Sequence, residues 1–177
     1  PVSVAVLGRE QLAASGVQHL QDVLGLVPNL NWASGSSRPR YFQLRGIGET
    51  DQWQGAPNPS VGFLIDGIDF SGVGMPATLF DVEQVEVLRG PQGAIHGANA
   101  LAGLISVRTR SAVPVDDRRF EVTAGDFGSW GLGGAAGGVL SGRAGAWFSE
   151  GGQPAAWRIV AQHYESDGFR RNAFLGR

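Results

Sequence analysis

Two pairs of carboxylates in the middle of the chain have a spacing that acid–base hydrolysis could use, Asp66 with Asp69 and Glu83 with Glu86. Such hydrolysis needs one carboxyl group to donate a proton while the other activates water or attacks. Asp66, however, directly precedes Gly67, and an Asp-Gly pair between two apolar runs is typical of a type I′ hairpin turn. The turn already explains Asp66 and leaves Asp69 without an identified partner, so the pattern favours a hairpin over a hydrolytic site.

The chain lacks the residue patterns for nucleophilic or metal catalysis. It contains no cysteine, which excludes disulfides, thiol catalysis and Cys-based zinc sites. His19, His96 and His163 are too far apart in sequence to form a ligand motif, and neither HExxH nor a nucleophile elbow occurs. We therefore predict no catalytic residue, no metal site and no cofactor. A soluble secreted β-rich hydrolase built on the four carboxylates remains a minor alternative.

Composition limits the remaining classes of protein. A formal net charge of −2 with scattered arginines gives no basic stripe, so we expect no nucleic-acid partner. Glycine makes up 28 of the 177 residues, well above the usual proportion of about 7%, while a hydrophobic content of 42% argues against disorder. No run approaches the ~18 apolar residues of a membrane-spanning helix. Any membrane role would therefore use β-strands.

The clearest signals of secondary structure lie in residues 81–110. A β-branched apolar strand over residues 82–88 is stopped by Gly90-Pro91, because proline has no N–H to donate and glycine accepts a reversed backbone. A second strand is predicted over residues 104–109. The glycines at positions 90, 93, 97 and 103 suit a backbone that packs closely against another surface. No Gly-Lys-Ser/Thr follows them, which excludes a phosphate-binding loop.

This segment closely resembles the signature that ends the plug domain of outer-membrane TonB-dependent receptors. The start of the chain, PVSV and then SGVQHLQDVLGLVPNL, resembles the opening of the same plug, so the resemblance covers nearly all of residues 1–109. It implies an α+β plug domain with a small mixed β-sheet and short helices over residues 1–112. The positions that carry the signature are Val85, Glu86, Val87, Leu88, Arg89, Gly90, Pro91, Gln92, Gly93, Gly97, Asn99, Ala100, Gly103 and residues 105–109.

Local patterns within residues 1–112 agree with a fold of short elements. We expect strands over residues 1–7, 41–44, 61–65 and 68–70, with the Asp-Gly turn between the last two. Helices are predicted over residues 9–14 and 19–27, the second of which is stopped by Pro28. His19 lies beside the apolar face of this helix, which favours a structural role. Residues 31–39 and the longer polar stretch 48–59 are expected to be loops.

Residues 113–177 have a different pattern. Within them, residues 120–125, 130–140 and 157–164 alternate apolar with polar or small side chains, as the strands of a transmembrane β-barrel do. A soluble antiparallel sheet produces the same alternation, and the resemblance of the preceding plug favours the barrel. At about ten residues a strand, this part supplies about three or four of the twenty-two strands that the family uses. We therefore expect the first antiparallel strands of an incomplete barrel, in a chain that is a truncation or a fragment.

The resemblance implies a function in the cell outer membrane rather than in catalysis. Members of the family use energy delivered by TonB to move the plug and take up a scarce ligand, most often a ferric siderophore. The implied partners are TonB, whose contact segment is expected outside this chain, a ferric siderophore or similar small ligand, and outer-membrane lipid. Uptake of vitamin B12, haem or an oligosaccharide by the same mechanism is the alternative.

The resemblance also implies roles for two arginines. Arg45, in the sequence LRG, and Arg89, in LRGPQG, match plug arginines that pair with barrel glutamates in the family, and a guanidinium suits such a bidentate pair. Two loops, one after the strand at 41–44 and one after the Asp-Gly hairpin, are expected to face outside and hold the ligand. The predicted ligand-binding residues in these loops are Glu49, Gln52, Trp53, Phe70 and Met75.

Overall fold

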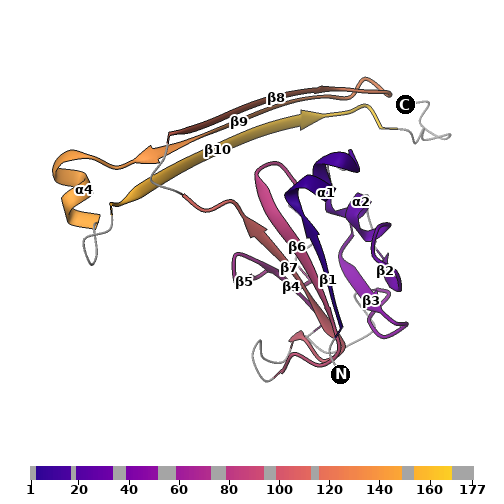
Figure 1. Ribbon diagram of the computed structural model, residues 1–177. Helices are drawn as coiled ribbons and strands as arrows, with labels where there is room; N and C mark the ends of the chain where they lie inside the picture. Colours follow the sequence, from indigo (N-terminus) through magenta and orange to yellow (C-terminus); the bar gives the residue numbers. More distant parts are fainter. Residues whose placement is uncertain are drawn as a thin grey trace. The chain divides into compact units, whose positions relative to one another are not determined.

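The computed structural model describes residues 3–16, 19–33, 39–51, 59–72, 79–93, 99–112, 116–148 and 154–168. The chain divides into two compact units, Pro1–Arg110 and Ser111–Arg177. Figure 1 shows that the first unit combines a sheet with short helices, whereas long strands dominate the second. In the described part of the chain, no helix has the length and apolar character needed to cross a membrane.

A five-stranded mixed sheet forms the centre of the first unit, in the strand order β1-β6-β7-β4-β5. β4 and β7 run parallel, and the other neighbouring pairs are antiparallel. The two strands predicted around the glycine-rich segment are β6 and β7, and the predicted mixed sheet is confirmed. The strands are β1 (Ser3–Gly8), β4 (Val61–Ile65), β5 (Ile68–Asp69), β6 (Val82–Arg89) and β7 (Gly103–Thr109).

Many side chains of this sheet are buried in the larger of two apolar clusters. Val85 and Val87 of β6 and Ile105 of β7 are all 0% exposed. They belong to the same cluster as Leu20 and Val23 of helix α2 (Leu20–Leu24), and helix α1 (Arg9–Ala14) lies alongside (Figure 1). Burying each such side chain contributes about 1.5–3 kcal/mol. Because helices this short are marginal alone, the buried face holds them in place.

The first unit also contains a two-stranded sheet. The loop prediction for residues 31–39 was therefore wrong for its first residues, which form a strand. β2 (Leu30–Ala33) pairs with β3 (Tyr41–Leu44), and Leu30 lies opposite Leu44. These two leucines are buried, at 6% and 1% exposure. The hairpin forms because its apolar side chains complete the core, a long-range effect that the polar composition of the segment does not indicate.

Other elements of the first unit differ from the prediction only at their ends. α2 stops at Leu24 because the N–H groups of Leu26 and Val27 bond to carbonyls three residues back, which tightens the chain into a turn. β6 continues to Arg89, and β5 ends at Asp69. The strand predicted at 41–44 and the helix predicted at 9–14 have the observed bounds.

The second unit is a three-stranded antiparallel sheet in the order β10-β9-β8. Its strands, β8 (Asp117–Ala124), β9 (Trp130–Val139) and β10 (Ala156–Glu165), lie where alternating segments were predicted. On one face, Phe120 and Val122 are 75% and 64% exposed, and Ile159 is 67% exposed. Helix α4 (Gly142–Phe148) joins β9 to β10 and corrects the expectation of strands and turns alone, since its glycines give the sequence little helix propensity.

Candidate functional site

One end of the five-stranded sheet brings together several of the predicted site residues. Ser3 at the start of β1 pairs with Arg89 at the end of β6, and Arg89 pairs with Gly103 at the start of β7. β4 is parallel to β7 and begins at the same level, with Val61 opposite Gly103. We call this the Arg89 end of the sheet. In Figure 1 it is the end at which β1 begins.

Arg45 lies in a tight turn directly after β3. Its φ of 56° is left-handed, and three residues later Gly48 has a φ of 147° and no room for a Cβ, which would collide with the Phe42 carbonyl. This turn lets Nη2 of Arg45 donate a 3.2 Å hydrogen bond to Ser3 Oγ. Because Ser3 is paired with Arg89, the structure brings the two predicted arginines to the same end of the sheet.

The two guanidinium groups differ in their surroundings. Arg89 is half-buried, and its Nε is buried without a hydrogen-bond partner among the described residues. Arg45 is largely exposed. Within the described ranges, the ion pairs do not involve either arginine. A desolvated N–H without an acceptor is unfavourable, and among the described residues Arg89 Nε is in that state.

Glu49 closes the base of the first predicted ligand loop. Its Oε1 accepts hydrogen bonds from Ser60 Oγ at 2.7 Å and from the Ser60 N–H at 3.0 Å, and its Oε2 lies 3.0 Å from the same nitrogen. Gln43 Nε2 donates to the Glu49 carbonyl. These bonds tie the chain after β3 to the residue that precedes β4. Gln52 and Trp53, also predicted for this loop, lie outside the described residues.

Phe70 lies at the base of the second predicted loop. Its N–H donates to the Phe63 carbonyl at 2.9 Å, and its half-buried ring packs against the core of the sheet. Two residues later, the Gly72 carbonyl accepts a 2.8 Å hydrogen bond from Arg40 Nε. The second loop therefore starts from an anchored backbone. Met75 lies outside the described residues.

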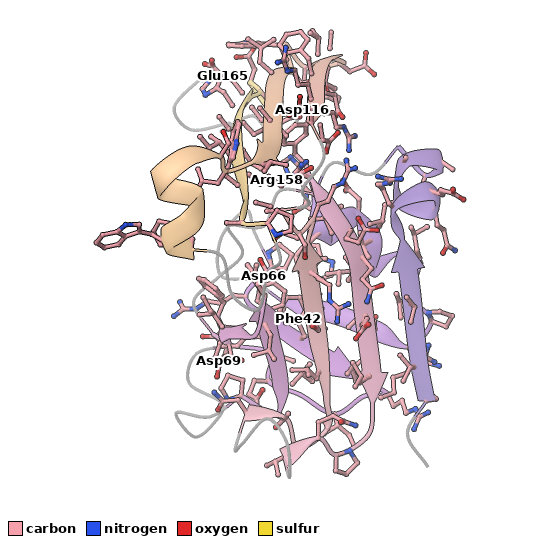
Figure 2. All side chains as sticks on the ribbon, turned by 60° about the vertical axis from the view of Figure 1, so that its left-hand side comes forward. Phe42, Asp66, Asp69, Asp116, Arg158 and Glu165 are labelled. Atoms are coloured by element: carbon pink, nitrogen blue, oxygen red, sulfur yellow. The ribbon has the colours of Figure 1, made fainter. Side chains whose placement is uncertain are left out.

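The aspartates considered for hydrolysis bind structural partners. Asp66 accepts hydrogen bonds from the N–H and the hydroxyl of Thr109 at 2.8 and 2.6 Å. Asp69, which had no identified partner from the sequence, accepts from the Ser71 N–H at 2.8 Å and from Asn99 Nδ2 at 2.6 Å. Figure 2 shows the two side chains at separate places along the β4–β5 hairpin. These bonds account for both aspartates without a hydrolytic pair.

The electrostatics of Asp69 agree with a structural role. Partial burial raises the pKa of its carboxyl group, but hydrogen bonds from Ser71 and Asn99 stabilise the ionised form more, so that the pKa is lowered. A carboxyl group with a lowered pKa is a poor general acid at neutral pH. Among the residues that the structure describes, no three His, Asp or Glu side chains gather as a metal ion would require.

Sequence reasoning missed an ion pair that crosses the second unit. Arg158 Nη1 of β10 lies 2.8 Å from Asp117 Oδ2 of β8, and the Arg158 side chain is only 6% exposed. Gly137 of β9 lies between the two in the register, and a Cβ there would be 2.9 Å from the Trp157 carbonyl. The glycines of β9 were the available signal, because they leave space for the flanking strands' side chains to meet.

Comparison with known proteins identifies relatives of the first unit. A family model described as "TonB-dependent Receptor Plug Domain" matches residues 1–104. The pesticin receptor of Yersinia pestis is 32% identical over 110 residues, which cover 62% of this chain and 16% of that receptor. The vitamin B12 transporter BtuB of Vibrio vulnificus is 28% identical over 117 residues, covering 62% of this chain and 18% of the transporter. The chain thus matches less than a fifth of the length of these relatives.

Solved structures share the fold. The ferric yersiniabactin uptake receptor FyuA of Yersinia pestis aligns with a TM-score of 0.65 and 28% identity, over 78% of this chain and 22% of that one. The pyoverdine outer membrane receptor FpvA of Pseudomonas aeruginosa aligns with a TM-score of 0.72, over 94% of this chain and 22% of that one; at 19% identity this likeness shows the fold alone. The predicted plug fold followed by antiparallel strands is therefore confirmed.

Proposed function

This chain belongs to the TonB-dependent receptor plug family, and from that premise we propose that it provides the plug and first barrel strands of a receptor for energy-dependent uptake. Residues 1–112 act as the plug, and residues 113–177 contribute strands to the surrounding barrel. The observation that carries this proposal is the family match over residues 1–104, which includes both arginines and both predicted ligand loops. TonB is the proposed source of energy.

The predicted outer-membrane localisation is confirmed at the level of the family. The three-stranded sheet has a surface suited to that place. One face exposes Phe120, Val122 and Ile159, while Arg158 and Asp117 pair on the other. Transmembrane strands direct apolar side chains towards lipid and polar ones inward. Outer-membrane lipid is therefore the proposed partner of the apolar face.

A ferric siderophore is the proposed ligand. The support is the 28% identity to a structure described as a ferric yersiniabactin uptake receptor. An iron complex already wrapped by its chelator requires no metal-ligating cluster on the protein, so the absence of cysteine is compatible with it. Vitamin B12 is the principal alternative, since a vitamin B12 transporter is also 28% identical. Haem or an oligosaccharide would use the same mechanism.

For Arg45 and Arg89 we propose an ion-pair lock with carboxylates that lie outside this chain. Two observations support the lock: both arginines reach the Arg89 end of the sheet, and Arg89 Nε is buried without a partner among the described residues. A carboxylate would satisfy that donor and neutralise the charge. Because breaking a buried pair is costly, the lock would keep the plug seated until energy is supplied.

Ligand contact is proposed for the two loops whose bases the structure fixes. Trp53 and Met75 provide apolar surface, and Gln52 provides hydrogen bonds, a mixture typical of ligand sites. Glu49 and Phe70 lie at the bases of these loops. The Glu49 carboxylate accepts hydrogen bonds from Ser60, and the Phe70 ring packs on the core. These two residues position the loops.

Catalysis is not part of the proposal. The relatives compared are receptors and transporters, and the aspartates that could support hydrolysis have structural partners. We propose that the chain has no enzymatic activity. A hydrolase assay on the purified receptor that found turnover abolished by Asp69→Asn would contradict this.

Uptake in cells tests the function directly. A strain that lacks the gene is complemented with the complete receptor, and cell-associated radioactive iron is measured with a panel of ferric siderophores. We expect uptake that needs both the receptor and a functional TonB. Labelled vitamin B12 in the same cells tests the main alternative. Uptake of either ligand that persists without TonB would reject the energy-dependent mechanism, and uptake of neither would reject both ligand classes.

A further inference from the structure

Helix α4 exposes two adjacent aromatic side chains, Trp147 and Phe148. Trp147 is 88% exposed, more than any other large apolar side chain among the described residues, and Phe148 is 72% exposed. Aromatic side chains carry some of the largest apolar surfaces in a protein. Their joint exposure on one short helix indicates a partner that is not water.

The backbone holds α4 close to the end of β9. Gly142 has a left-handed φ of 73°, and a Cβ on the buried Gly145 would collide with the Leu140 carbonyl. Glycine is therefore required for the helix to pack this closely. The strands that α4 connects are paired at this point, with Val139 opposite Ala156. α4 thus presents its aromatic pair from a fixed position at one end of the three-stranded sheet.

The exposed apolar face of this sheet is bounded by tryptophans. Trp130 and Gly138 lie on that face of β9, eight residues apart, and Trp157 of β10 lies opposite Gly138. At about 3.4 Å per residue the two ends are about 27 Å apart along the strand, or about 20 Å along the membrane normal at a tilt of 35–45°. Phe120, Val122 and Ile159 lie between them, with Arg118 and His163 as the polar side chains of this stretch.

The height of about 20 Å along the membrane normal is close to that of the apolar band of transmembrane β-barrels, which is about 25 Å tall and flanked by aromatic girdles. α4 follows β9 at the end marked by Trp157, so α4 adjoins the end of the apolar face, where hydrocarbon would give way to headgroups. Tryptophan favours that interface because its ring is apolar while its N–H can remain hydrated.

We propose that α4 lies in the interfacial region of the outer membrane, where Trp147 and Phe148 insert among the lipid headgroups and anchor the Trp157 end of the sheet. The inference rests on the proposed function, because it requires the apolar sheet face to contact lipid. The partner is a lipid surface, since α4 adjoins the end of that face. Interfacial helices bind through such an apolar side.

Fluorescence quenching in the complete receptor, reconstituted in bilayers, tests the anchor. This chain has no cysteine, so once cysteines elsewhere in the receptor are replaced, single sites can carry an environment-sensitive fluorophore. Phe148→Cys is the test site, Phe120→Cys reports the middle of the apolar face, and Thr123→Cys reports the opposite face. Nitroxide lipids labelled at the headgroup or deep in the acyl chain serve as quenchers.

We expect the ratio of shallow to deep quenching to be higher at Phe148→Cys than at Phe120→Cys, with little quenching at Thr123→Cys. Quenching at Phe120→Cys but not at Phe148→Cys would overturn the anchor and leave the proposed function intact. Absence of quenching at both would reject the membrane placement of the sheet as well. A Phe148 label shielded from water but quenched by neither lipid would mean that protein covers α4, which also overturns the anchor. Trp147→Cys is the second site if the first variant does not assemble.

Discussion

Glu49 holds Ser60 by both its hydroxyl and its backbone N–H, with Oε1 2.7 Å from Oγ and 3.0 Å from the nitrogen. Eleven positions separate the two residues, and the segment between them contains Gln52 and Trp53. A carboxylate that accepts several hydrogen bonds is held in one side-chain conformation and fixes the positions of the groups that donate to it. This contact therefore sets the distance between the two ends of the first ligand loop.

Removal of the Glu49 carboxylate should loosen the base of that loop. Glu49→Ala leaves the half-buried Ser60 N–H without its acceptor, which costs about 1–3 kcal/mol. We expect faster hydrogen exchange at the Ser60 amide and weaker ligand binding in the complete receptor. Glu83→Ala, at an exposed glutamate of β6, is the matched control and should leave both unchanged. Equal hydrogen exchange at the Ser60 amide in the two variants would contradict this role of the Glu49 carboxylate.

Loss of both arginines at the Arg89 end of the sheet should destabilise the seated plug. In the complete receptor, Arg45→Ala with Arg89→Ala leaves buried carboxylates uncompensated, at a cost of about 3–5 kcal/mol. Denaturant titration and hydrogen exchange of β6 measure the effect. Arg108→Ala, which removes an exposed arginine of β7, provides the control. A double variant as resistant as the wild type would rule out the ion-pair lock.

Trp53 should contribute directly to ligand affinity. We predict that Trp53→Ala weakens binding in the complete receptor by about tenfold or more, since 1.4 kcal/mol corresponds to a factor of ten and binding hot spots exceed this. Isothermal titration with the cognate ligand measures the loss. Trp32→Ala, in β2 and 41% exposed, controls for general loss of a tryptophan. If Trp53→Ala binds normally with the plug folded, Trp53 has only a packing role.

Gly48 should tolerate no side chain. A Cβ would collide with the Phe42 carbonyl, and the φ of 147° is one that other residues rarely adopt. Gly48→Ala should therefore cost at least the ~1–3 kcal/mol typical of overpacking and displace Arg45 from Ser3. Gly8→Ala is the matched control, because nothing lies within 4 Å of a Cβ there. Similar denaturation midpoints for the two variants would show that the turn adapts.

Asp69 should make the stability of the plug depend on acid pH. Its pKa is lowered in the folded protein by the hydrogen bonds from Ser71 and Asn99, whereas an unfolded aspartate has a pKa of about 3.9. Its stabilisation is therefore present above the unfolded value and is lost as the pH falls through the lowered one. Asp69→Asn should flatten this part of the profile of unfolding free energy against pH. Parallel profiles for wild type and variant would exclude the effect.

The amino-acid sequence by itself determined the elements whose signals are local. The helix at 9–14, the strand at 41–44 and the turn at Asp66-Gly67 follow from apolar spacing, aromatic residues that favour strands and residues that accept a left-handed backbone, and the structure has them at those positions. The glycine-rich signature also placed β6 and β7, because it combines a strong strand pattern with a defined stop. Family membership could be read from the same positions.

Only the tertiary structure decided which of these residues meet. Strand register brings Ser3 beside Arg89, and chain segments far apart in sequence place Asp117 within 2.8 Å of Arg158. β2 forms because Leu30 is buried against a distant part of the chain, and α4 forms where its local sequence has little helix propensity. Such contacts depend on packing among remote segments, whose energies outweigh local preference by several kcal/mol in aggregate. Local patterns therefore predict the elements of this protein, and long-range packing decides the partners of its charged side chains.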